Sequence, residues 1–124
     1  MPSFHVAERW VRDRSKPEAV RFIAFCWALE SYVWFTGQKF HRTYARLGAQ
    51  LGFDWEKKPT GAQMELALDV LHRERERVKA KLVLFAELRK KEKREGRRQW
   101  SAAKYAWVYE PDFLEFPHPE MPVI

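Results

Sequence analysis

The sequence predicts an all-α protein: a small helical domain with a buried aromatic helix, an amphipathic basic helix and one long helix. Two observations favour this fold class. Residues 62–95 contain no Gly or Pro and are mostly good helix formers, and residues 19–35 are apolar on nearly every side of a helix. Because 124 residues is close to the usual size of one domain, we expect a single helical domain over residues 1–110 and a Pro-rich C-terminal tail over residues 111–124.

The aromatic helix is expected to begin at the segment Ser15-Lys16-Pro17-Glu18. Ser15 is a residue that caps a first helical turn, Pro17 fits a position whose N–H has no helical partner, and Glu18 would complete a capping box. The apolar residues that follow predict a helix buried in the centre of the domain. Gly37 is the expected C-terminal stop.

The amphipathic helix is expected over residues 39–53. Apolar side chains recur there at helical spacing, whereas Lys39, Arg42 and Arg46 fall together on the other side. Gly52 is expected to end this helix.

The long helix is expected over residues 62–95, after a second capping box formed by Thr60 and Gln63. At 1.5 Å per residue it would run about 50 Å, which exceeds a compact domain of this size. Its apolar residues follow alternating spacings of four and three, with Arg75 as the one polar member of the seam. The length and the seam favour self-association as a homodimer through this helix.

The stretch Tyr44-Ala45-Arg46-Leu47-Gly48-Ala49-Gln50-Leu51-Gly52-Phe53 resembles the first helix of the helix-turn-helix in bacterial regulators and plasmid replication proteins. The resemblance covers residues 40–53, about a tenth of the chain. It implies an alternative fold, a winged helix-turn-helix with a C-terminal β-hairpin. Residues 81–90 and 99–109 would then pair as strands around Gly96.

The residues that carry chemistry do not predict an enzyme, a cofactor site or a metal site. The four histidines are scattered along the chain, and the single cysteine, Cys26, lies in an apolar run. Glu30 is the one carboxylate inside the aromatic helix. It would be a general base or, as is favoured, a structural residue that lies on the least buried stripe or pairs with an arginine of another helix.

Cations are concentrated in particular segments of a chain whose formal charge is +6. Residues 89–98 hold seven cations and two anions, a composition that favours a phosphate-bearing or acidic partner. Residues 73–81 alternate Arg or Lys with Glu and are more typical of ion pairs on a solvated face. Trp100 and Tyr105 follow the tract and would either stack on bases or belong to the core.

The leading hypothesis is a non-enzymatic, nucleic-acid-binding accessory protein of low sequence specificity, with DNA and RNA both open as the ligand. The alternative is a helical protein-interaction module, a subunit or inhibitor of a larger assembly, whose charges are solvated or pair with an acidic protein partner. We expect a cytoplasmic protein without a membrane partner, and the absence of Asn is typical of thermophiles. The candidate phosphate-contacting residues are Lys39, Arg42, Arg46, Arg89, Lys90, Lys91, Lys93, Arg94, Arg97 and Arg98.

Overall fold

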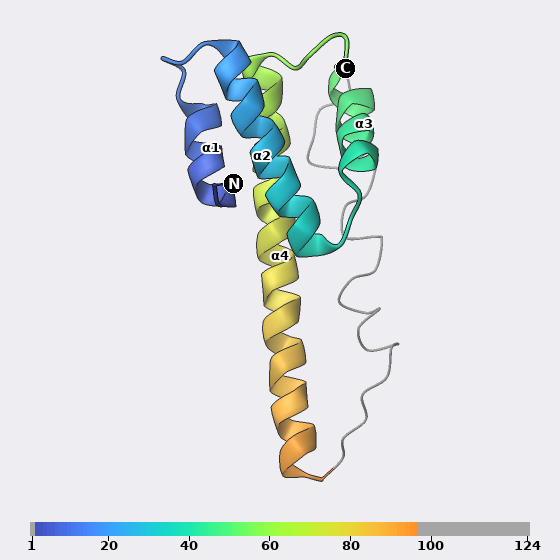
Figure 1. Ribbon diagram of the computed structural model, residues 1–124. Helices are drawn as coiled ribbons and strands as arrows, with labels where there is room; N and C mark the ends of the chain where they lie inside the picture. The colour runs from blue at the N-terminus through green and yellow to red at the C-terminus, as the bar shows by residue number, and fades with distance from the viewer. Residues whose placement is uncertain (1, 97–124) are drawn as a thin grey trace.

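The computed structural model describes residues 2–96, and this part of the chain forms four helices and no strand. They are α1 (Phe4–Arg12), α2 (Glu18–Thr36), α3 (Phe40–Leu51) and α4 (Gly61–Arg94). In Figure 1, α1 and α3 lie on opposite sides of α2, and α4 crosses α2 and extends well past the other helices. The predicted all-α class is confirmed.

A single hydrophobic core lies where α2 meets the other three helices. Phe4 of α1, Phe25 and Leu29 of α2, Tyr44 of α3 and Leu68 of α4 are all fully buried in it. Removal of these side chains from water is the main force that holds the helices together.

The aromatic helix α2 is central, as predicted, but one stripe of it faces solvent. Trp34 is 78% exposed and Ile23 is 50% exposed, whereas Ala24 and Ala28 are buried. The apolar character of α2 therefore exceeds what its neighbours in the described structure cover.

The sequence prediction missed α1. Its N-cap is Ser3, whose hydroxyl accepts a hydrogen bond from the Val6 N–H. Phe4, Ala7 and Val11 form its buried face at positions i, i+3 and i+7. This pattern is readable in the sequence, but it is short and interrupted by charged residues.

The capping box predicted at the start of α2 is wrong. Pro17 is the N-cap and makes no side-chain capping hydrogen bond, and the Ser15 hydroxyl donates instead to the Asp13 carboxylate at 2.5 Å. The carboxylate of Glu18 caps a different helix, because it accepts a hydrogen bond from the Gly61 N–H at the start of α4. Glu18 therefore ties the first turns of α2 and α4 together.

The predicted stops of α2 and α3 are confirmed. Gly37 has φ 74° and Gly52 has φ 89°, both in the left-handed region that glycine adopts without steric cost. Only a short turn therefore separates α2 from α3, and it brings the end of one helix next to the start of the other.

The long helix is confirmed as α4, and so is its capping box, in which Thr60 and Gln63 bond reciprocally. The first part of the predicted seam belongs to the core, since Met64, Leu71 and Val78 are buried. Arg75 enters this seam with its guanidinium 5.1 Å from the ring centroids of both Phe4 and Phe35. Only the seam beyond Val78 is left for the predicted homodimer.

The winged helix-turn-helix alternative is not supported. Residues 81–90, which would have formed the first strand of its hairpin, lie inside α4. Residues 99–109 and the predicted tail, residues 111–124, lie outside the described residues. Among residues 2–96, no helix combines the length and the apolar character that crossing a membrane would need.

Candidate anion-binding site

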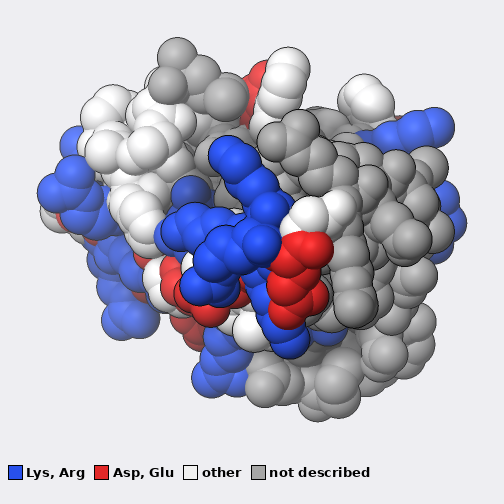
Figure 2. Space-filling model, turned by 90° about the horizontal axis from the view of Figure 1, so that it is seen from below, with Lys and Arg blue, Asp and Glu red and all other residues white. Residues whose placement is uncertain are grey.

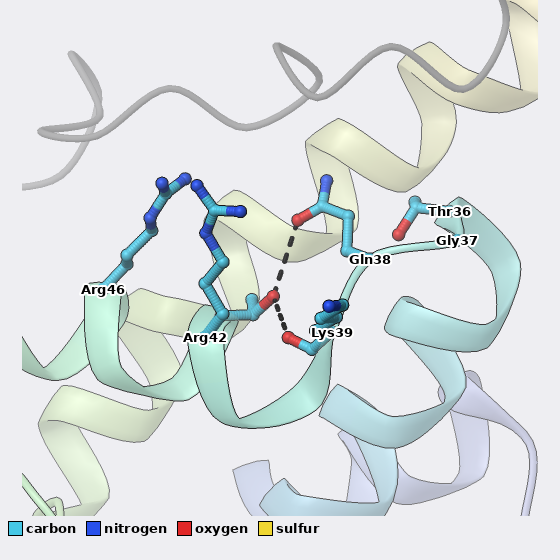
Figure 3. A pocket seen from close by; sticks show the side chains of 7 residues that line it. Thr36, Gly37, Gln38, Lys39, Arg42 and Arg46 are labelled. Atoms are coloured by element: carbon cyan, nitrogen blue, oxygen red, sulfur yellow. Dashed lines mark hydrogen bonds between the residues drawn. The ribbon is translucent and has the colours of Figure 1, made fainter. Parts of the chain in front are cut away.

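A pocket of about 180 Å³ lies at the junction of α2 and α3. It is lined by Thr36, Gly37, Gln38, Lys39, Arg42, Thr43 and Arg46. The three cations singled out in the amphipathic helix thus meet at one concave surface. Figure 3 shows the side chains of Arg42 and Arg46 projecting from the same face of α3, with their guanidinium groups side by side.

Hydrogen bonds fix the polar side chains that line the pocket. The Thr43 hydroxyl donates to the Lys39 carbonyl at 2.9 Å and also lies 3.5 Å from the Gln38 side-chain oxygen (Figure 3). The amide nitrogen of Gln38 donates to the Tyr32 hydroxyl at 3.4 Å. The Thr36 hydroxyl donates to the Tyr32 carbonyl at 2.9 Å. The turn is therefore held in place from both helices.

The electrostatics of the pocket favour an anion. Of the described residues that line it, none is acidic. Arg42 and Arg46 are one helical turn apart, a spacing at which like charges repel. The N-cap of α3, Lys39, makes no side-chain capping hydrogen bond, so the positive end of the helix dipole is not neutralised by a cap. An anion in the pocket would reduce the repulsion and interact with the helix end.

The second group of candidate residues lies at the far end of α4. Lys90, Lys91, Lys93 and Arg94 are all exposed there. Figure 2 looks at the molecule from this end and shows Lys and Arg side chains gathered around it, with acidic side chains between them. Arg89 belongs to α4 by its backbone, but its side chain is outside the described part of the structure, as are residues 97 and 98.

The structure does not bring the two basic groups together. Arg75 contacts Phe35, at the end of α2 that leads into the pocket. From Arg75 to Arg94 the helix rises about 28 Å at 1.5 Å per residue. In Figure 1 the C-terminal end of α4 extends well away from α3. Any single ligand that contacts both groups must therefore be extended.

The mixed charges in the middle of α4 form ion pairs within the helix, as predicted. Arg77 donates two hydrogen bonds to the Glu74 carboxylate, and Lys79 lies 3.4 Å from Glu76. This part of the helix is thus electrostatically different from the cation-rich end.

The structure describes two further residues that the sequence singled out, Glu30 and Cys26. Glu30 is exposed on α2, which agrees with its assignment to the least buried stripe. Cys26 is half-buried, and burial raises the pKa of its thiol to about 11, so it is a poor nucleophile at neutral pH. Trp100 and Tyr105 lie outside the described residues.

The prediction that the histidines do not converge is wrong for two of the four. His5 and Glu8 of α1 and His72 of α4 have side-chain ligand atoms that all lie within 4.8 Å of one another. His5 and Glu8 are three residues apart in the sequence, a spacing that places two side chains on one face of a helix. The helix that contains them, α1, was not predicted. The approach of His72 depends on the packing of α1 against α4.

Comparison of the chain with models of protein families, with curated proteins and with solved structures finds no match in any of the three.

Proposed function

We propose that this chain is a non-enzymatic, nucleic-acid-binding accessory protein that contacts phosphates with little sequence readout. The observation that carries the proposal is the pocket at the α2–α3 junction, where Lys39, Arg42 and Arg46 line one concave surface beside the start of α3. Guanidinium groups match phosphate oxygens in geometry as well as charge. Contacts of this kind fix the position of a protein on a backbone without reading bases.

The basic end of α4 supports a polymeric ligand over a small anion. The exposed cations of this end are Lys90, Lys91, Lys93 and Arg94, and they lie roughly 22 to 28 Å along the helix from the level of the pocket. Successive phosphates of one strand of duplex DNA lie about 3.4 Å apart along its axis, so this distance corresponds to about seven to eight nucleotides. One nucleic acid would therefore contact both basic groups, with Arg89, Arg97 and Arg98 adding to the second.

A protein-interaction module is the second candidate, and a specific observation favours it. Val83 and Leu84 are 60% and 57% exposed on the part of α4 that extends beyond the other helices, and Trp34 is 78% exposed on α2. Exposed apolar side chains of this size are typical of surfaces that bind another protein, including a second copy of the chain. Under this hypothesis the cations are solvated or pair with an acidic partner.

Fluorescence anisotropy with labelled duplex DNA and labelled single-stranded RNA, each over a salt series, separates the two candidates. The nucleic-acid proposal predicts binding that weakens steeply with salt, with a slope of log K against log salt near −9 for duplex DNA if all ten candidate cations contact phosphates. The nucleic acid with the higher affinity identifies the ligand class. Absence of binding at low salt would reject the proposal and favour the protein-interaction module.

A further inference from the structure

A cluster of two imidazoles and one carboxylate lies between α1 and α4. His5 and Glu8 are three residues apart on α1, which places them on one face of the helix, and His72 comes from α4. Their ligand atoms all lie within 4.8 Å of one another, and His72 Nδ1 is 3.5 Å from Glu8 Oε2. We propose that His5, Glu8 and His72 form a binding site for a divalent first-row transition metal ion, with Zn²⁺ as the representative ion.

The donor set matches the chemistry of such ions. Imidazole nitrogen suits zinc, copper and nickel, and sites with three protein ligands leave positions open for water or another ligand. Zn–N bonds of about 2.0–2.1 Å place the ligand atoms of a tetrahedral site roughly 3.4 Å apart. His72 Nδ1 and Glu8 Oε2, 3.5 Å apart, are already close to this spacing. Since all the ligand atoms lie within 4.8 Å of one another, the other pairs need to close in by no more than about 1.4 Å, which rotation of surface side chains can achieve. His5 is exposed and the other two are half-buried, so an ion reaches the cluster from solvent.

The helices that carry the ligands are already held in place. Phe4, next to His5, is fully buried, and its ring centroid lies 6.3 Å from that of His72. The ring centroids of His5 and His72 lie 6.0 Å apart. The backbone positions of the cluster are thus set by the core, and binding requires little ordering of the main chain.

Two arginines touch the cluster and determine what binding costs. Arg12 donates to Glu8 at 3.3 Å but makes a shorter hydrogen bond, 2.7 Å, to Asp69. If Glu8 turns to bind the metal, Arg12 loses its hydrogen bond to Glu8 but keeps the one to Asp69, so its guanidinium stays paired. Arg75 Nη1 lies 3.3 Å from His5 Nε2, so its positive charge opposes a nearby dication. Removal of that charge should therefore strengthen metal binding.

A bound ion would link α1 to α4, and it would stabilise the folded chain because the unfolded chain does not bring the three ligands together. This effect is independent of the proposed nucleic-acid binding, since α1 and α3 lie on opposite sides of α2 (Figure 1). The two proposals can therefore fail separately.

Isothermal titration of the metal-free full chain with ZnCl₂ tests the proposal. One Zn²⁺ per chain is expected, with a matching rise in Tm. His5→Gln, Glu8→Gln and His72→Gln should each weaken binding at least about tenfold, since even loss of a residue that supports a ligand weakens metal sites by 10- to 100-fold. His41→Gln is the matched control, because His41 lies on α3 beside Trp55 and should leave the affinity unchanged.

Arg75→Gln gives a readout of opposite sign, a tighter Zn²⁺ complex. Circular dichroism of each variant verifies that the helices are intact, so that lost binding reports on the ligands. Three results would each overturn the assignment. The first is that the unmodified chain does not bind Zn²⁺, and the second is that His5→Gln and His72→Gln bind it as tightly as the unmodified chain does. The third is that His41→Gln loses binding.

Discussion

The guanidinium of Arg21 occupies the space where a side chain on Gly61 would begin. A Cβ at position 61 would lie 2.3 Å from Arg21 Nη1. Arg21 is 6% exposed, and its Nε donates to the Val11 carbonyl at 2.7 Å, so the guanidinium is not free to swing away. One buried side chain of α2 thus contacts both the end of α1 and the start of α4.

Gly61→Ala is therefore expected to destabilise the protein by about 1–3 kcal/mol, the usual cost of forcing an extra carbon into a packed site. The free energy of unfolding from urea denaturation measures the effect. In an Arg21→Met background the same substitution should cost little, because the guanidinium that it would meet is gone. If Gly61→Ala costs the same free energy of unfolding in both backgrounds, the Arg21 guanidinium is not what excludes a side chain at position 61.

A second close approach occurs inside α3. A Cβ on Gly48 would lie 2.1 Å from the Phe53 carbonyl oxygen, and that carbonyl belongs to the backbone that follows the helix. The Phe53 N–H in turn donates to the Gly48 carbonyl at 3.0 Å.

Gly48→Ala should therefore cost about 3 kcal/mol or more, because backbone has to move where a side chain would simply rotate. Ala49→Ser, at an exposed neighbouring position, is the control and should stay within about 1 kcal/mol of the unmodified protein. Both are read from chemical denaturation. A Gly48→Ala variant as stable as the control would contradict the tight packing of α3 against the following loop.

Stability should fall in alkaline solution. Burial raises the pKa of Cys26 from 9.0 to about 11 and that of Tyr44 from 10.0 to about 12. Since the neutral forms are favoured in the folded state, their contribution is complete below pH 9 and is lost as the pH rises toward 12. Denaturation at a series of pH values should show this decline. A Tyr44→Phe variant should show a shallower decline above pH 10, and an unchanged decline would exclude Tyr44 as a source.

Local signals predicted three of the four described helices, whereas α1 was missed because its apolar pattern is short and interrupted by charged residues. The Thr60–Gln63 capping box and the glycines at positions 37 and 52 act within a few residues of themselves, so they are readable in the sequence. The expected Ser15 capping box failed because α2 begins only at Glu18, with Pro17 as its N-cap. Ser15 bonds to Asp13 instead, and Glu18 accepts a hydrogen bond from Gly61, 43 residues away.

In the candidate sites, too, the residues grouped by local spacing were predictable and those brought together by packing were not. Lys39, Arg42 and Arg46 share one helix face, so their grouping follows from helical spacing. Gln38 and Thr36, which complete the pocket, depend on the turn between two helices. His5 and His72 meet only because α1 packs on α4, and no local pattern reports that contact.

The basic end of α4 has its own test. Replacing Lys90, Lys91, Lys93 and Arg94 together by Gln should weaken nucleic-acid binding and reduce the magnitude of the salt slope by about 3 to 4. The helix should persist, because Gln is nearly as good a helix former as Lys and Arg. Circular dichroism checks the helix and anisotropy checks the binding. Unchanged affinity would remove this part of α4 from the proposed interface.

The most direct test of the phosphate-binding pocket is the salt dependence of duplex DNA binding by a Lys39→Gln, Arg42→Gln, Arg46→Gln variant. Its control removes three cations from the region of α1, by Arg9→Gln, Arg14→Gln and Lys16→Gln. If the pocket contacts phosphates, the pocket variant should lose affinity and the magnitude of its slope should drop by about 3, while the control keeps the original slope. Equal slopes in the pocket variant, the control and the unmodified chain would contradict the proposed function.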